Sequence, residues 1–298
     1  RNLCVFIVTI FVAGVAHGAG FDNSSVPSDV QWIAHIDVDV YRLTDVAGML
    51  SSIRPEKHRH GLAFLKQQLG LDPAEDINSV TLYGSNLGRK DAVAVVKGNL
   101  DSELIIRALE KNGSYHAVGR GGYMLHKWDD PRRGSPCVAC FIAGDTVVLA
   151  GSETEALEFA EVNKGKRESL ADAGAQGLRV PDAEVGRFFV ASVNGPLERL
   201  NGSAHAKVFR NAKAMSMAMG EIDGQLQAEL NVIAEDSEAA SQVEIVFMGL
   251  RAAALLNRER KPGLANLAEN AIITTDGDKV RILLASRPEE LRVLFSGR

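Results

Sequence analysis

The sequence contains two segments that share the same series of short motifs, and this repetition limits the folds available to the chain. A triplet Asp-Ser-Glu begins at Asp101 and recurs at Asp236, 135 residues later. In both places it follows an alternating apolar and polar run and precedes a helical pattern. The preceding strands align at the same offset, 92–97 on 227–232 and 80–84 on 215–219. Two segments of this kind predict two units built from the same order of elements.

Further matches lie on either side of these strands. Gly144-Asp145 recurs as Gly277-Asp278, and Gly and Asp favour hairpin turns because they tolerate positive φ. Each turn is followed by an apolar strand and then by Ser-x-x-Glu, beginning at Ser152 and at Ser286, a pattern typical of a capped helix start. Upstream, Val26-Pro27 and the strand after it resemble Val180-Pro181 and its strand. We therefore expect an internal repeat.

The order of predicted elements defines the expected fold class. Both copies follow the order strand, helix, strand, strand, helix, strand, with one extra strand and helix. This order predicts an α+β protein of two tandem ferredoxin-like (βαββαβ) units with antiparallel sheets. The expected division is a signal peptide over 1–18, a first repeat unit over 19–165, a polar linker over 166–179 and a second repeat unit over 180–298.

The element boundaries follow from hydrophobic periodicity and from Gly, Pro and capping residues. In the first copy we expect strands over 31–40, 77–84, 91–98, 115–119, 123–128, 137–143 and 146–151, and helices over 41–70, 101–112 and 152–164. In the second copy we expect helices over 197–212, 235–258 and 262–269.

The N-terminal segment resembles a secretory signal peptide. An apolar run extends from Leu3 to Val15, one Arg precedes it, and small residues surround His17. The run is shorter than the 18 to 20 apolar residues, roughly, that a bilayer-spanning helix needs. We expect cleavage after residue 18, export to the periplasm or the extracellular medium, and no transmembrane anchor in the mature chain. An uncleaved anchor is the alternative.

The charge balance argues against nucleic acid as a partner. The whole chain has a formal net charge of -5, and removal of Arg1 with the signal peptide makes it -6. A nucleic-acid-binding protein normally carries a basic patch or stripe. The one local basic cluster, residues 54–60, also contains Glu56 and is interpreted as a solvated surface.

Cys137 and Cys140 form the one Cys-x-x-Cys motif of the sequence. In redox proteins the first thiol of such a motif caps a helix, where backbone amides stabilise the thiolate. Here the surrounding residues predict a strand, on which positions three apart point to opposite faces. Two separate buried thiols are the favoured interpretation, and a structural disulfide or a redox site are the alternatives.

His35, Asp37 and Asp39 alternate along the first expected strand, which would place an imidazole and two carboxylates on one face. These are metal-ligating groups, and His58 and His60 are further candidates for such a site. A polar strand face is the simpler interpretation, and we expect no metal or other cofactor. The Gly-rich segment 119–122 precedes a strand rather than a helix, so it predicts a hairpin turn and not a phosphate-binding loop.

Residues 72–84 (DPAEDINSVTLYG) carry a resemblance to a known group of proteins. The segment is similar to a family of uncharacterised secreted proteins abundant in planctomycete-type bacteria, and the similarity of pattern continues through most of the chain. The family implies an exported α+β protein. It implies no activity, cofactor or catalytic residue.

These observations leave two hypotheses for function. The first is an exported non-enzymatic protein that binds an unknown protein or cell-envelope partner, or that acts as an envelope-associated scaffold. The second is an exported thiol-redox or hydrolytic enzyme that uses Cys137 and Cys140 or the strand of His35. The first is favoured because the polar groups that would carry chemistry are not repeated between the two copies.

Overall fold

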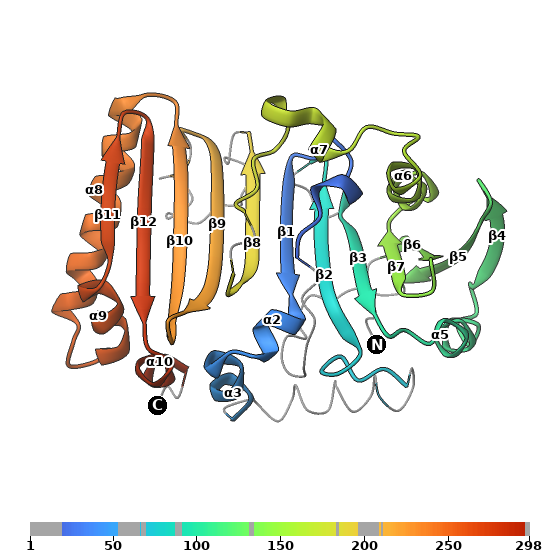
Figure 1. The fold of residues 1–298 in the computed structure, drawn as a ribbon, viewed down its shortest axis with the longest axis horizontal. Helices are drawn as coiled ribbons and strands as arrows, with labels where there is room; N and C mark the ends of the chain where they lie inside the picture. The colour runs from blue at the N-terminus through green and yellow to red at the C-terminus, as the bar shows by residue number, and fades with distance from the viewer. Residues whose placement is uncertain are drawn as a thin grey trace. The chain divides into compact units, whose positions relative to one another are not determined.

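In the computed structural model the described residues are 20–52, 66, 70–86, 91–130, 134–182, 185–195, 209 and 211–295. They belong to two compact units, one formed by residues 1–43 and 54–177 and the other by residues 44–53 and 178–298 (Figure 1). The fold is α+β with antiparallel strand pairing, as the sequence predicts. The expected signal peptide, residues 1–18, lies outside the described residues.

Unit 1 is built on seven strands in the order β1-β2-β3-β7-β6-β5-β4, and every neighbouring pair is antiparallel. The strands are β1 (Trp32–Asp37), β2 (Ile77–Gly84), β3 (Val93–Gly98), β4 (His116–Arg120), β5 (Tyr123–Asp130), β6 (Ser135–Ile142) and β7 (Thr146–Ala150). Its helices are η1 (Asn23–Ser25), α2 (Val38–Arg42), α5 (Ser102–Leu109), α6 (Glu153–Asn163), α7 (Leu170–Ala173) and η3 (Gly174–Gln176).

Unit 2 contains five strands in the order β8-β9-β10-β12-β11, again with antiparallel neighbours. The strands are β8 (Arg187–Asn194), β9 (Ala212–Ile222), β10 (Gln225–Ala234), β11 (Ile272–Asp276) and β12 (Lys279–Ser286). The helices are α3 (Asp45–Ser52), α8 (Ser237–Leu256), α9 (Pro262–Glu269) and α10 (Pro288–Phe295). Helix α3 comes from the first half of the chain and packs against α10, so it belongs to unit 2.

The strand order corrects the expected ferredoxin-like topology. A ferredoxin-like unit contains split βαβ elements, in which another strand lies between the two that flank a helix. Here β1 pairs directly and antiparallel with β2, although α2 and α3 lie between them in the chain. The sequence pattern predicts the order of elements along the chain. Which strands become neighbours depends on the path of the segments that connect them.

Three expected elements differ clearly from the structure. The strand expected over 31–40 ends at Asp37, because the Asp37 carboxylate accepts a hydrogen bond from the Val40 amide and caps helix α2. At the start of the helix expected over 41–70, for which Pro55 is the expected break, the structure has two helices, α2 and α3, separated by residues 43 and 44. The helix expected over 197–212 falls mostly outside the described residues, and Ala212 begins β9.

The segment expected to be a polar linker, 166–179, makes specific contacts within unit 1 through its first residues. Leu170 is buried, and its amide donates to the Val26 carbonyl at 2.8 Å. Ser169 and Asp172 form a capping box at the start of α7. The segment therefore packs against the beginning of the unit before the chain passes into unit 2.

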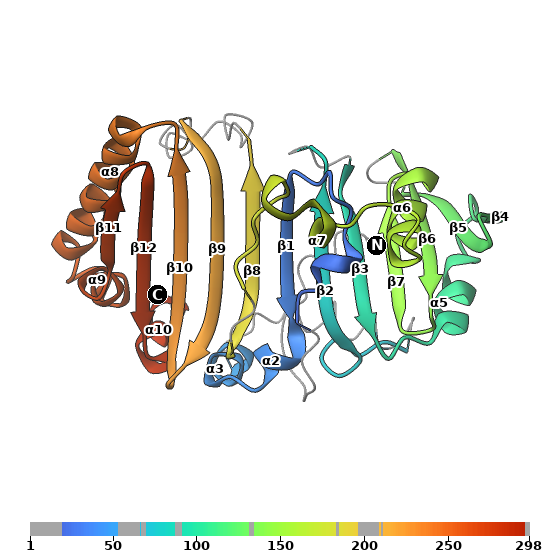
Figure 2. The same cartoon turned by 45° about the horizontal axis from the view of Figure 1, so that its top comes forward.

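The sheet of unit 2 has one apolar and one polar face, because side chains alternate along each strand. On β10, Leu226, Leu230 and Val232 point to the face that α8 and α9 cover, together with buried Val280 and Ile282 of β12. Figures 1 and 2 show both helices at the side of the unit where β11 lies. The opposite face carries Gln227, Glu229 and Asn231, and it forms the candidate site.

Candidate functional site

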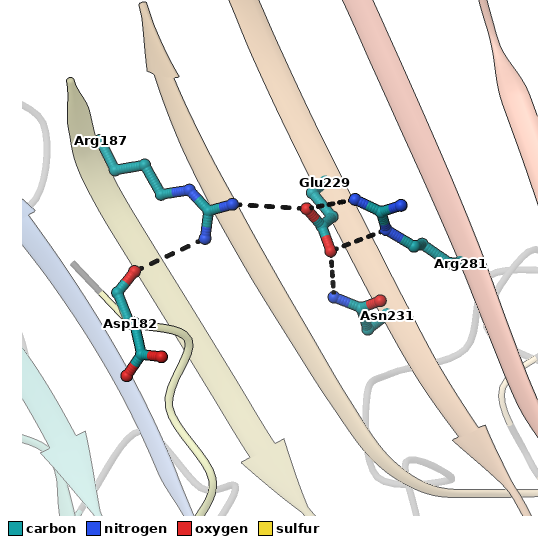
Figure 3. Close-up of polar contacts among 5 residues, drawn as sticks. All are labelled: Asp182, Arg187, Glu229, Asn231 and Arg281. Carbon is teal, nitrogen blue, oxygen red and sulfur yellow. Dashed lines mark hydrogen bonds and ion pairs between the residues drawn. The ribbon is translucent and has the colours of Figure 1, made fainter. Parts of the chain in front are cut away.

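The centre of the polar face is Glu229, whose carboxylate is bound by three neighbouring side chains (Figure 3). Arg281 of β12 donates to it through Nε at 2.9 Å and through a terminal nitrogen at 3.1 Å. Asn231 donates at 3.0 Å from the same strand, and Arg187 of β8 contacts it at 3.4 Å. Arg187 also donates to the Asp182 carbonyl at 3.5 Å. Three strands thus contribute to one hydrogen-bonded cluster.

The strand register explains why these residues meet. Asn231 lies opposite Arg281 across β10 and β12, and Glu229 is two residues from Asn231 on the same face. Arg187 lies beside a register shift in the β8 and β9 pairing, between residues 187 and 189. Such irregularities redirect a side chain, and here Arg187 reaches across β9 to Glu229.

The cluster forms the floor of an open cavity of about 510 Å³. Its polar lining comes from Arg179, Asp182, Arg187, Ser216, Gln227, Asn231 and Arg281, in addition to Glu229. The hydrogen bond from Arg281 and those from its neighbours hold the pKa of Glu229 below its usual value, against the effect of partial burial. The carboxylate is therefore ionised at neutral pH and fixes the two guanidinium groups in place.

The polar groups that line this cavity are suited to hydrogen bonding with a ligand. Guanidinium and amide groups donate hydrogen bonds, while Gln227 and Ser216 also offer accepting oxygens. Neither histidine nor cysteine occurs among the described residues that line the cavity. A polar ligand that both donates and accepts hydrogen bonds fits such a surface.

The structure does not bring His35, Asp37 and Asp39 onto one strand face. His35 is buried on β1 and its Nδ1 lies 2.8 Å from the Thr81 hydroxyl, while Asp37 caps α2. Asp39 lies within α2, where it pairs with Arg42 and accepts from Asn78 at 2.7 Å. The expected shared face is wrong because the strand ends at Asp37. His58 and His60 lie outside the described residues.

No group of three metal-ligating side chains occurs among the residues that the structure describes. The Gly-rich segment 119–122 forms the turn between β4 and β5, with Gly121 and Gly122 at positive φ, as the sequence predicts.

Cys137 and Cys140 lie on β6, opposite Trp128 and Leu125 of β5, and both are buried. They are not joined by a disulfide. Burial raises the pKa of the Cys140 thiol to about 11. The structure therefore shows two separate buried thiols, the interpretation that the sequence favours.

The Glu229 cluster is not evident from the sequence. The available signal is the alternation of polar residues at 225, 227, 229 and 231, which indicates that β10 has one polar face. The two arginines are separated from Glu229 by 42 and 52 residues. The strand pairing alone places them beside it.

The comparisons with known proteins concern the fold. No family model matches the chain, and no curated protein matches it. A structure of the Treponema protein TP0453, in crystal form III, is similar with a TM-score of 0.51 and 13% identity, over 93% of this chain and 99% of that chain. Crystal forms IV and I of TP0453 match with TM-scores of 0.46 and 0.45, at 11% and 13% identity. Similarity at this level supports the α+β fold and gives no function.

Proposed function

We propose that this chain is an exported, non-enzymatic binding protein of the cell envelope, and that the open cavity around Glu229 is its binding surface. The observation that carries the proposal is the cluster of Arg187, Glu229 and Arg281. It holds hydrogen-bonding groups in fixed positions on an open sheet face. A polar small molecule, or a polar segment of an envelope partner, is the class of ligand that this surface suits.

The alternative, an exported thiol-redox or hydrolytic enzyme, has less support. Cys140 is fully buried with a raised pKa, so its thiolate is scarce at neutral pH. His35 is buried against Phe21 and Thr81, and it does not line the cavity around Glu229. Cys140 and His35 are thus both enclosed by the packing of unit 1.

We also propose that the two units derive from an internal repeat. Five strands of unit 1, in the order β1-β2-β3-β7-β6, correspond to β8-β9-β10-β12-β11 of unit 2. The Gly98 amide donates to the Asp145 carbonyl at 2.8 Å, and the Ala234 amide donates to the Asp278 carbonyl at the same distance. Asp101 and Asp236 both cap the next helix. These matches support common descent of the two units.

Native mass spectrometry of protein purified from the envelope fraction of its source tests the binding proposal. We expect the wild-type protein to retain a polar ligand or partner, and Arg281→Gln to lose it. Arg107→Gln is the matched control, because Arg107 is an exposed arginine in an ion pair on α5. Equal retention by Arg281→Gln and by the wild type would contradict the proposal. Turnover of a substrate that Cys140→Ala abolishes would favour the enzyme.

Export is tested separately by N-terminal sequencing of the mature protein. A mature chain that begins at Ala19 is the expected result, since the apolar run from Leu3 to Val15 has the length of a signal peptide. A mature protein that still contains the Leu3 to Val15 segment would indicate the uncleaved anchor.

A further inference from the structure

Helix α8 exposes an unusual amount of apolar surface for a helix that packs on a sheet. Nine large apolar side chains are exposed among the described residues, and six of them lie between residues 245 and 272. The 20-residue helix has a mean hydropathy of 1.4 in its most apolar window, and 22% of that window is buried. Length and composition alone would also fit a membrane-spanning helix.

Most of the exposed apolar residues of α8 lie on one face, which we call the free face: Ile245, Met248, Gly249, Ala252, Ala253 and Leu256. Leu250, which is 47% exposed, lies to one side of it. Their spacing of three and four residues forms a stripe along the helix. Val243 and Ala254, on the opposite side, are buried against the unit. Ile245, Met248 and Leu256 are 63%, 53% and 88% exposed, respectively. The free face contains no charged residue over three turns.

The two ends of the helix carry opposite charge. The acidic residues Glu235, Asp236 and Glu238 surround the first turn, and all three are exposed. After the last turn come the exposed residues Arg258, Arg260 and Lys261, with the single acidic residue Glu259 among them. Arg258 pairs with Glu269 at 2.6 Å, so Arg260 and Lys261 supply the basic charge of this end. An apolar stripe between an acidic and a basic end is complementary to a copy of itself that runs in the opposite direction.

We propose that the free face of α8 is a self-association surface, on which two copies of this chain pair with their α8 helices antiparallel. When the pair is centred between residues 250 and 251, Ile245 of one copy lies opposite Leu256 of the other. Gly249 then lies opposite Ala252. The acidic first turn of α8 in each copy then lies near the basic segment that follows α8 in the other copy. This is the two-fold arrangement that soluble homodimers most often adopt.

The shape of the free face favours a second helix over a lipid surface as the occupant. The small residues Gly249, Ala252 and Ala253 occupy its middle, and a Cβ built on Gly249 would meet no atom within 4 Å. Small residues let two helix backbones approach closely, with Ile245 and Leu256 closing the contact at each end. A helix that lies on a bilayer instead needs bulky apolar anchors along its apolar face.

Sedimentation or light scattering of the full chain over a concentration series tests this inference. We expect the wild-type protein to dimerise and Met248→Glu to weaken the dimer by at least about tenfold. Met124→Glu, at a methionine of equal exposure on β5 of unit 1, should leave dimerisation unchanged. Because Met248 is exposed, the variant should fold, which circular dichroism checks. A wild-type monomer at concentrations on the order of 100 µM would overturn the inference.

Charge reversal tests the direction of the pair. Glu238→Lys and Lys261→Glu should each weaken the dimer, and the double variant should recover it. Failure of the double variant to recover would overturn the antiparallel arrangement. A protein that stays monomeric but binds vesicles of phosphatidylcholine and phosphatidylglycerol, with Met248→Glu abolishing that binding, would assign the free face to a membrane instead. Loss of the dimer in Met248→Glu does not depend on the cavity around Glu229, so the two proposals fail separately.

Discussion

Asp39 and Arg42, one helical turn apart in α2, form an ion pair in which both side chains are almost completely buried. Arg42 also donates to the Ile77 carbonyl at 2.7 Å, and Asn78 donates to the second carboxylate oxygen of Asp39. Buried charges are tolerated when each is paired and hydrogen-bonded, as here. The pair ties α2 to the start of β2 in unit 1.

Removal of one member of this pair should destabilise the protein strongly. Asp39→Ala leaves the Arg42 guanidinium buried without its carboxylate, and we expect a loss of about 3 to 5 kcal/mol in the free energy of unfolding. Chemical denaturation measures it. The control is Glu103→Ala on α5, which breaks an exposed pair with Arg107 and should change stability by less than about 1 kcal/mol. Similar effects of the two substitutions would contradict this account.

The Glu229 cluster should contribute stability that depends on pH. The pKa of Glu229 is lowered in the folded protein, chiefly by the hydrogen bond from Arg281, relative to the unfolded-state value of 4.5. Its contribution is therefore fully present above pH 4.5 and is lost as the pH falls through the folded-state pKa. Glu229→Gln should flatten this part of the stability curve and cost about 1 to 2 kcal/mol at pH 7. Denaturant titrations between pH 3 and 7, roughly, measure both effects.

His126 should give a second pH dependence at higher pH. Burial lowers the pKa of His126, which lies 2.8 Å from the Tyr115 hydroxyl and packs edge-on against Phe141. In the unfolded chain His126 takes up a proton near the ordinary pKa of 6.5, whereas in the folded protein it does so only at lower pH. Stability from this residue is present above pH 6.5 and is lost as the pH falls through the lower folded-state pKa. In His126→Gln the free energy of unfolding should depend less on pH below 6.5. An unchanged pH dependence would exclude His126 as the cause of this effect.

The buried cysteines should react slowly. At pH 7 we expect alkylation of Cys137 and Cys140 in the folded protein to be much slower than in the denatured protein, because both thiols are buried and the pKa of Cys140 is raised. Substitution of either by Ala should cost on the order of 1 to 2 kcal/mol through lost packing. Mass spectrometry of timed alkylation reactions measures the first effect. Rapid modification of one thiol in the folded protein would favour the redox hypothesis.

The local pattern of the sequence predicts many of the elements in this protein. The strand expected over 77–84 is β2, the helix expected over 262–269 is α9, and the helix expected over 152–164 is α6 with one residue fewer at each end. Asp101 and Asp236 cap their helices as the two triplets indicate. These features depend on interactions between residues a few positions apart, which a linear pattern records directly.

Strand pairing and the candidate site depend on contacts between distant parts of the chain. The sequence predicts that β10 has a polar face, but the register with β12 brings Arg281 to Glu229, and the shift in the pairing of β8 with β9 brings Arg187. In the same way, the capping of α2 by Asp37 ended the strand that would have aligned His35 with Asp39. Periodicity determines which face a side chain occupies, whereas only the tertiary structure decides which side chain stands opposite, because a shift of one residue in register changes every neighbour.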